Sequence, residues 1–185
     1  MPLPQSVARA ELHVRRIELR GYQRVDGLYD VEVRMVDTKA DDLTVEGGRH
    51  VPAGEPIHDM SIRLVVDQHL NVADVFASTD ASPFGVCPEA TNTLQSLKGL
   101  RIGSGWSKAI RERLAGRKGC THLTELLSPL ATVAFQTLGK VREKQPIAVD
   151  ASGKPSKIDS CYAYASDREL VRRQWPTHYT RIEEK

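Results

Sequence analysis

The feature of this sequence that most constrains its fold is a change in the spacing of apolar residues near residue 80. Over residues 11–36 and 60–78, apolar and polar residues alternate, as expected for strands with one buried face. Beyond Cys87, apolar residues recur every three or four positions, as expected for amphipathic helices. The sequence therefore predicts an α+β fold, with an antiparallel sheet of at least four strands packed against about three helices.

Two hairpins account for the predicted sheet. The first covers residues 11–36 and turns at Asp26-Gly27, a dipeptide that favours a tight hairpin turn. The second covers residues 60–78 and turns at residues 67–71. The polar segment between the hairpins, residues 37–56, is expected to be a long loop.

Three helices are expected in the second half of the chain. Pro88 suits the first position of a helix, because the missing N–H has no helical partner there. Gly99 follows the end of this helix, and a second helix is expected to end near Leu114. The third begins around Thr121 and contains Pro129, which is expected to kink or restart it.

Two prolines and the lack of periodicity predict a flexible tail at residues 1–10. The 185-residue length favours a single domain over residues 11–185, with 139–185 as a loop-rich C-terminal extension. A net charge of +2, with arginines and acidic residues interleaved, argues against nucleic-acid binding. No apolar run has the length of about 20 residues that a membrane span needs. Three widely spaced cysteines do not form a disulfide framework, so a cytoplasmic location is expected. The oligomeric state is left open.

Five side chains are candidates for a metal site. Cys120 and His122 are two residues apart just before the third helix, where both can point the same way. Cys87 precedes the first helix, and His58 and Asp59 begin the third strand. Because these joints can meet at one end of a sheet, the five side chains are expected to gather there. Cysteine, histidine and aspartate suit zinc or iron rather than calcium or magnesium.

Each candidate also has a structural interpretation. Cys87 and Cys120 could be buried packing residues. His58 could be a loop histidine with its hydrogen bonds satisfied, and His122 could bond to a backbone carbonyl. Asp59 could accept hydrogen bonds from nearby amides. The remaining histidines are expected at the surface; they are His13, His50, His69 and His178.

Several motifs resemble those of a bacterial domain family with no assigned function. They are Gly21-Tyr22, Asp26-Gly27, His58-Asp59-Met60, the run Gly119-Cys120-Thr121-His122-Leu123, and Trp175-Pro176. This resemblance covers nearly the whole chain and implies no activity.

Residues 57–138 also resemble the NifU/IscU iron–sulfur cluster scaffold, which implies a core of that type. In that family a Cys-x-Asp segment leads into a strand, a second cysteine opens a helix, and a His-Cys pair opens a later helix. Here His58-Asp59, Cys87 and the pair Cys120/His122 stand in those places. With His58 in place of the first cysteine, the resemblance implies one zinc or iron ion bound by Asp59, Cys87, Cys120 and His122, rather than an iron–sulfur cluster.

Three functions follow from this candidate site. The first is a metal-binding protein of iron–sulfur-scaffold type. The second is a metalloenzyme that activates water against a small organic substrate, with His58 as the general base. The third is a non-catalytic binding module with structural zinc. The sequence leaves these alternatives open.

Overall fold

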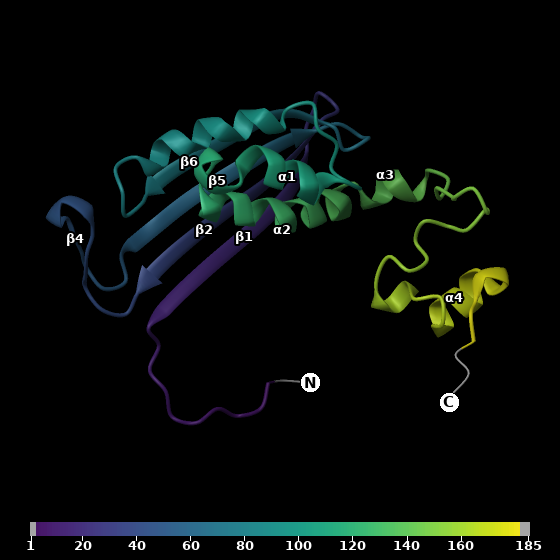
Figure 1. The fold of residues 1–185 in the computed structure, drawn as a ribbon, viewed down its shortest axis with the longest axis horizontal. Coiled ribbons are helices and arrows are strands. Elements are labelled where there is room, and N and C mark those ends of the chain that lie inside the picture. The colour runs from purple at the N-terminus through teal and green to yellow at the C-terminus, as the bar shows by residue number, and fades with distance from the viewer. Residues whose placement is uncertain (1–2, 182–185) are drawn as a thin grey trace. The chain divides into compact units, whose positions relative to one another are not determined.

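The computed structural model describes residues 3–181, which divide into two compact units, one ending at Gly139 and one beginning at Lys140. The first unit holds a four-stranded antiparallel sheet in the order β1-β2-β5-β6 (Figure 1). Its strands are β1 (His13–Gln23), β2 (Tyr29–Lys39), β5 (Pro56–Val66) and β6 (Val72–Ala81). The helical elements of this unit are the 3₁₀ turn η1 (Glu46–Gly48), the 3₁₀ helix η2 (Cys87–Leu97), α1 (Trp106–Leu114), the 3₁₀ turn η3 (Gly116–Lys118) and α2 (Thr121–Thr137). The predicted α+β fold class is confirmed.

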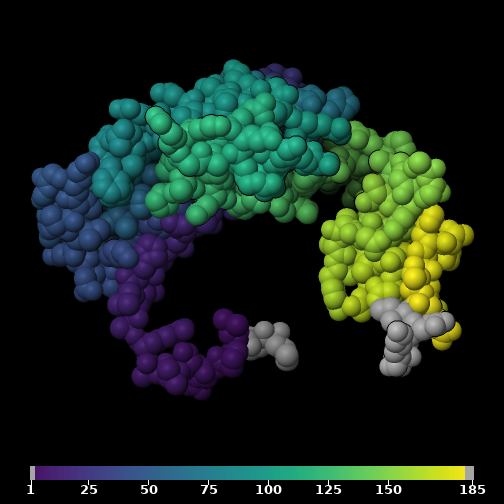
Figure 2. Space-filling view, viewed as in Figure 1, coloured from purple at the N-terminus to yellow at the C-terminus, as the bar shows by residue number. Residues whose placement is uncertain are grey.

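The inner face of the sheet forms the core. Along β2 every second residue from Tyr29 to Asp37 is buried, and Met35 and Val33 lie opposite Met60 and Ile62 of β5. Helix α2 packs on this face and buries a stripe of apolar side chains that begins at Leu123. Pro129 lies inside α2 without ending it. In Figure 2 teal and green atoms, from the middle of the chain, form much of the surface of this unit on the side shown.

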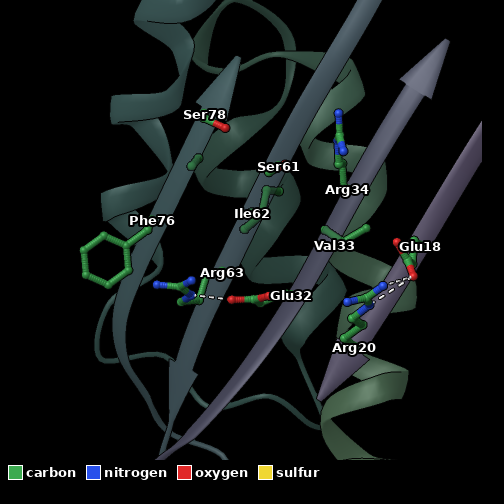
Figure 3. Close-up of a pocket in the computed structure, with 11 residues that line it drawn as sticks. Glu18, Arg20, Glu32, Val33, Arg34, Ser61, Ile62, Arg63, Phe76 and Ser78 are labelled. Carbon is green, nitrogen blue, oxygen red and sulfur yellow. Dashed lines mark hydrogen bonds and ion pairs between the residues drawn. The ribbon is translucent and has the colours of Figure 1, made fainter. Parts of the chain in front are cut away.

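The outer face of the sheet carries charged side chains of both signs (Figure 3). The guanidinium of Arg63 donates to Glu32 at 2.6 Å, and that of Arg20 donates to Glu18 at 3.0 Å. These residues line a shallow hollow of about 540 Å³ on the open sheet. Because its charges already pair with one another, this face has the character of a solvated surface.

The first helix is a 3₁₀ helix rather than an α-helix. The hydroxyls of Thr91, Thr93 and Ser96 each donate to the carbonyl three residues earlier, at 2.7, 2.7 and 2.8 Å. Bonds of this kind favour the tighter i to i+3 turn. The helix lies along β6, and buries Leu94 and Leu97.

The predicted loop at residues 37–56 is partly ordered as strand. Strand β2 continues through Asp37 to Lys39, and a two-stranded ribbon follows, with β3 (Leu43–Thr44) paired to β4 (His50–Val51). The second unit contains most of α3 (Gly139–Glu143), α4 (Glu169–Gln174) and two 3₁₀ turns (Tyr162–Tyr164 and Pro176–His178). Among the described residues, no helix combines the length and apolar character that crossing a membrane requires.

Gly21 of β1 allows the last turn of α2 to approach the sheet. A Cβ atom at this position would lie 1.8 Å from Oγ1 and 2.8 Å from Cβ of Thr137. We expect Gly21→Ala to lower the free energy of unfolding by about 2 kcal/mol, because the helix must move away from the strand. Urea denaturation measures this loss. Gly27→Ala is not a control because Gly27 has a positive φ, whereas Gly85→Ala, with open space around it, should be close to neutral.

Candidate metal centre

Three potential metal ligands converge at one end of the inner sheet face. They are Asp37 near the end of β2, His58 near the start of β5, and His122 in the first turn of α2. One donor atom from each residue lies within 4.8 Å of the other two. Asp37 and His58 are opposite each other in the register of β2 and β5, and the rings of His58 and His122 have centroids 3.9 Å apart.

Asp37 is the most deeply placed of the three, with 1% of its side chain exposed. Arg15, its partner across β1 and β2, donates to both carboxylate oxygens at 2.8 Å. His58 Nδ1 lies 3.0 Å from Oδ2 of the same carboxylate, and His13 Nε2 lies 3.5 Å from Oδ1. The carboxylate is therefore held in one orientation by groups from two neighbouring strands.

These contacts favour an ionised Asp37 and a neutral His58. Burial would raise the pKa of Asp37, but the hydrogen bonds and positive charge of Arg15 outweigh it, and the pKa lies below its usual value. Burial lowers the pKa of His58, the positive charge that His122 can carry lowers it further, and Asp37 opposes both effects. A carboxylate and a neutral imidazole are the forms that bind metal ions.

A pocket of about 530 Å³ opens beside these histidines. His58 and His122 line it together with Cys87 and Cys120. Further lining comes from the segment before η2, from η2 itself and from the loop before α2; the residues include Pro83, Phe84, Val86, Glu89, Arg117 and Lys118.

Four of the five residues singled out from the sequence therefore line one pocket. The thiol of Cys120 lies 3.9 Å from Nδ1 of His122. Asp59 lies elsewhere: consecutive side chains of a strand point to opposite faces, so Asp59 is on the outer face when His58 is on the inner one. There Arg34 donates to its carboxylate at 2.9 and 2.7 Å.

Asp37 was not among the residues singled out from the sequence, which placed it at the start of a loop. The signal that identifies it is the alternation of β2: Asp37 continues the inward row that includes Val31, Val33 and Met35. A carboxylate in a buried apolar row requires charged partners. His13 is exposed, as expected from the sequence, and it also lies against this carboxylate.

Residues 13–136 match a family described as a protein of unknown function (DUF2889), and the match spans more than half of the 185 residues. The chain belongs to this family. The DUF2889 region runs from the first residue of β1 nearly to the end of α2, so it contains Asp37, His58, His122 and the whole pocket. The predicted membership of a family with no assigned function is confirmed. No curated protein and no solved structure matches the chain, so the NifU/IscU resemblance gains no support.

Proposed function

We propose that this chain is a metal-binding protein in which Asp37, His58 and His122 hold one zinc or iron ion. The observation that carries the proposal is the convergence of their donor atoms within 4.8 Å, from three separate elements. Two imidazoles and one carboxylate form a ligand set that suits either metal. Because the three residues lie far apart in the sequence, only the folded chain brings them together.

The spacing of these donor atoms is compatible with coordination. Ligand atoms bound at about 2.1 Å are about 3.0 Å apart when they meet the ion at right angles, and about 3.4 Å apart in a tetrahedral site. Asp37 Oδ2 and His58 Nδ1 are 3.0 Å apart. A carboxylate oxygen has a second lone pair, so Asp37 can accept from Arg15 and still bind an ion.

Cys120 can supply an exchangeable fourth ligand beside Asp37, His58 and His122, whose donor atoms form the convergent set. Its thiol lies 3.9 Å from His122 Nδ1, close to the separation of about 3.6 Å between sulfur and nitrogen ligands of tetrahedral zinc. Cys87 lines the same pocket and is not assigned to the ion. Asp59, bound to Arg34 on the other face, is not part of the ligand set.

The surrounding pocket favours an exchangeable site over a purely structural one. Structural zinc sites are closed by four protein ligands, whereas catalytic sites keep one position for water or substrate. Here His58, His122 and Cys120 all line a space of about 530 Å³. An ion at its wall has room for a non-protein ligand if the thiol leaves, and a bound water would become more acidic there.

Zinc titration of the full chain tests the proposal. Protein treated with a chelator and then dialysed should bind one zinc ion per chain, and its thermal unfolding temperature should rise with zinc because the ion binds only the folded form. Calcium and magnesium serve as matched ions and should give no such rise, since they prefer oxygen ligands. Absence of saturable zinc binding, or an equal response to calcium, would contradict the proposal.

A further inference from the structure

The pocket beside the proposed metal centre has two chemically different walls. One wall is apolar and consists of Pro83, Phe84, Val86 and Ala90. Phe84 and Val86 keep 52% and 62% of their surface exposed, although both are large apolar residues. The other wall is cationic and consists of Arg117 and Lys118. Such a division suits a ligand with an apolar part and an anionic part.

The apolar wall is held in place by the β3–β4 region. Arg49 donates to the carbonyl of Ser82 at 2.7 Å, and the amide of Gly85 donates to Glu46 at 3.0 Å. These two contacts fix the segment that carries Phe84 and Val86. The wall is therefore preformed, which reduces the entropy that a ligand must overcome on binding.

The cationic wall contains a free guanidinium. Within residues 3–181, no hydrogen bond or ion pair engages the side chain of Arg117, whereas Lys118 donates to the carbonyl of Glu112 at 2.9 Å. Glu89 is the one carboxylate among the described residues that line the pocket. With two cations against one anion and histidines at its inner end, the pocket favours an anionic ligand.

We propose that this pocket binds a small carboxylic acid with an apolar chain or ring. The carboxylate pairs with Arg117, and the apolar part lies against Phe84 and Val86. Arginine binds a carboxylate through two parallel hydrogen bonds, a geometry that a planar head group matches. The inference rests on the proposed metal-binding function for the ion at the inner end of the pocket. The contacts of the carboxylic acid with the pocket are tested separately from that ion.

Calorimetric titration of the full, zinc-saturated chain tests the ligand class. The probes are octanoate, acetate, octan-1-ol and octyl phosphate. Octanoate should bind at least about tenfold more tightly than acetate, which lacks the apolar part, and than octan-1-ol, which lacks the charge. Equal affinity for octanoate and octan-1-ol would overturn the anionic part of the proposal. Equal or tighter binding of octyl phosphate would overturn the choice of a carboxylate.

Arg117→Gln should weaken octanoate about tenfold and leave octan-1-ol unchanged. Arg113→Gln is the matched control, because Arg113 is an exposed arginine of α1 outside the pocket lining. Equal effects of the two substitutions would overturn the proposal, as would failure of every acid to bind. If zinc binds and no acid does, this inference alone fails. If chelator-treated protein binds octanoate and zinc does not bind, the proposed metal function alone fails.

Discussion

Replacing His58 with alanine is expected to lower the affinity for zinc at least about a hundredfold while leaving the sheet intact. Loss of a group that merely orients a ligand typically costs ten- to a hundredfold in metal affinity, so loss of a ligand should reach the upper end. Asp37 keeps both hydrogen bonds from Arg15 in this variant, so its carboxylate stays paired. Competition with a coloured zinc chelator measures the affinity, and circular dichroism reports the fold.

His69→Ala is the matched control for this measurement. His69 lies exposed in the turn between β5 and β6, away from the pocket lining, so its removal should leave zinc affinity unchanged. Cys120→Ser, which replaces the proposed fourth ligand with a poorer one, should fall between the two. If His58→Ala binds zinc within threefold of the unmodified chain, the triad is not the metal site.

The hairpins could be predicted because the sequence specifies them locally. Alternation defines which residues face inward, and Asp26-Gly27 supplies a turn at which Gly27 adopts a positive φ of 86°. The first predicted hairpin, at residues 11–36, corresponds to strands that end at Lys39, three residues later. Strand ends depend on neighbours from elsewhere in the chain, here Arg15 and His58 against Asp37, and local patterns do not report those.

The candidate site could be predicted only in part, because local patterns report where strands and helices begin but not which distant residues contact one another. The joints of the fold, where strands start and helices begin, were enough to bring His58, Cys87, Cys120 and His122 to one pocket. Asp59 was expected beside His58 because the two residues are adjacent in the sequence. The two side chains lie on different faces of the sheet, because neighbouring residues of a strand point to opposite faces. Asp37 was overlooked because a charged residue after an apolar strand resembles the start of a loop. Its contacts with Arg15 and His58, which are distant in sequence, explain how a carboxylate stays buried there.

Replacing Arg15 with methionine is expected to lower the free energy of unfolding by about 2 to 3 kcal/mol. The substitution keeps an unbranched apolar side chain in place of the arginine stem. It leaves the carboxylate of Asp37, which is 1% exposed, without its main cation. Removing one partner of a buried ion pair costs about 3 to 5 kcal/mol of stability. The expected loss is smaller here because a third of the Arg15 side chain is exposed, so water can partly replace the guanidinium. Urea denaturation followed by the fluorescence of Trp106, in a Trp175→Phe background, measures the change in the first unit.

Arg34→Met tests whether burial of the ion pair causes the loss of stability expected for Arg15→Met. Arg34 makes the same two-bond contact with Asp59. The Arg34 side chain is 61% exposed and that of Asp59 is 11% exposed, so water can replace the lost cation more readily and the loss of stability should be smaller. Equal losses for Arg15→Met and Arg34→Met would contradict the buried-charge explanation.

The effect of zinc on the stability of the two variants provides a second test. An ion bound to Asp37 supplies the positive charge that Arg15→Met lacks. Saturating zinc should therefore narrow the difference in stability between Arg15→Met and the unmodified chain, and leave the difference between Arg34→Met and the unmodified chain unchanged. Stability and metal binding would then depend on the same carboxylate.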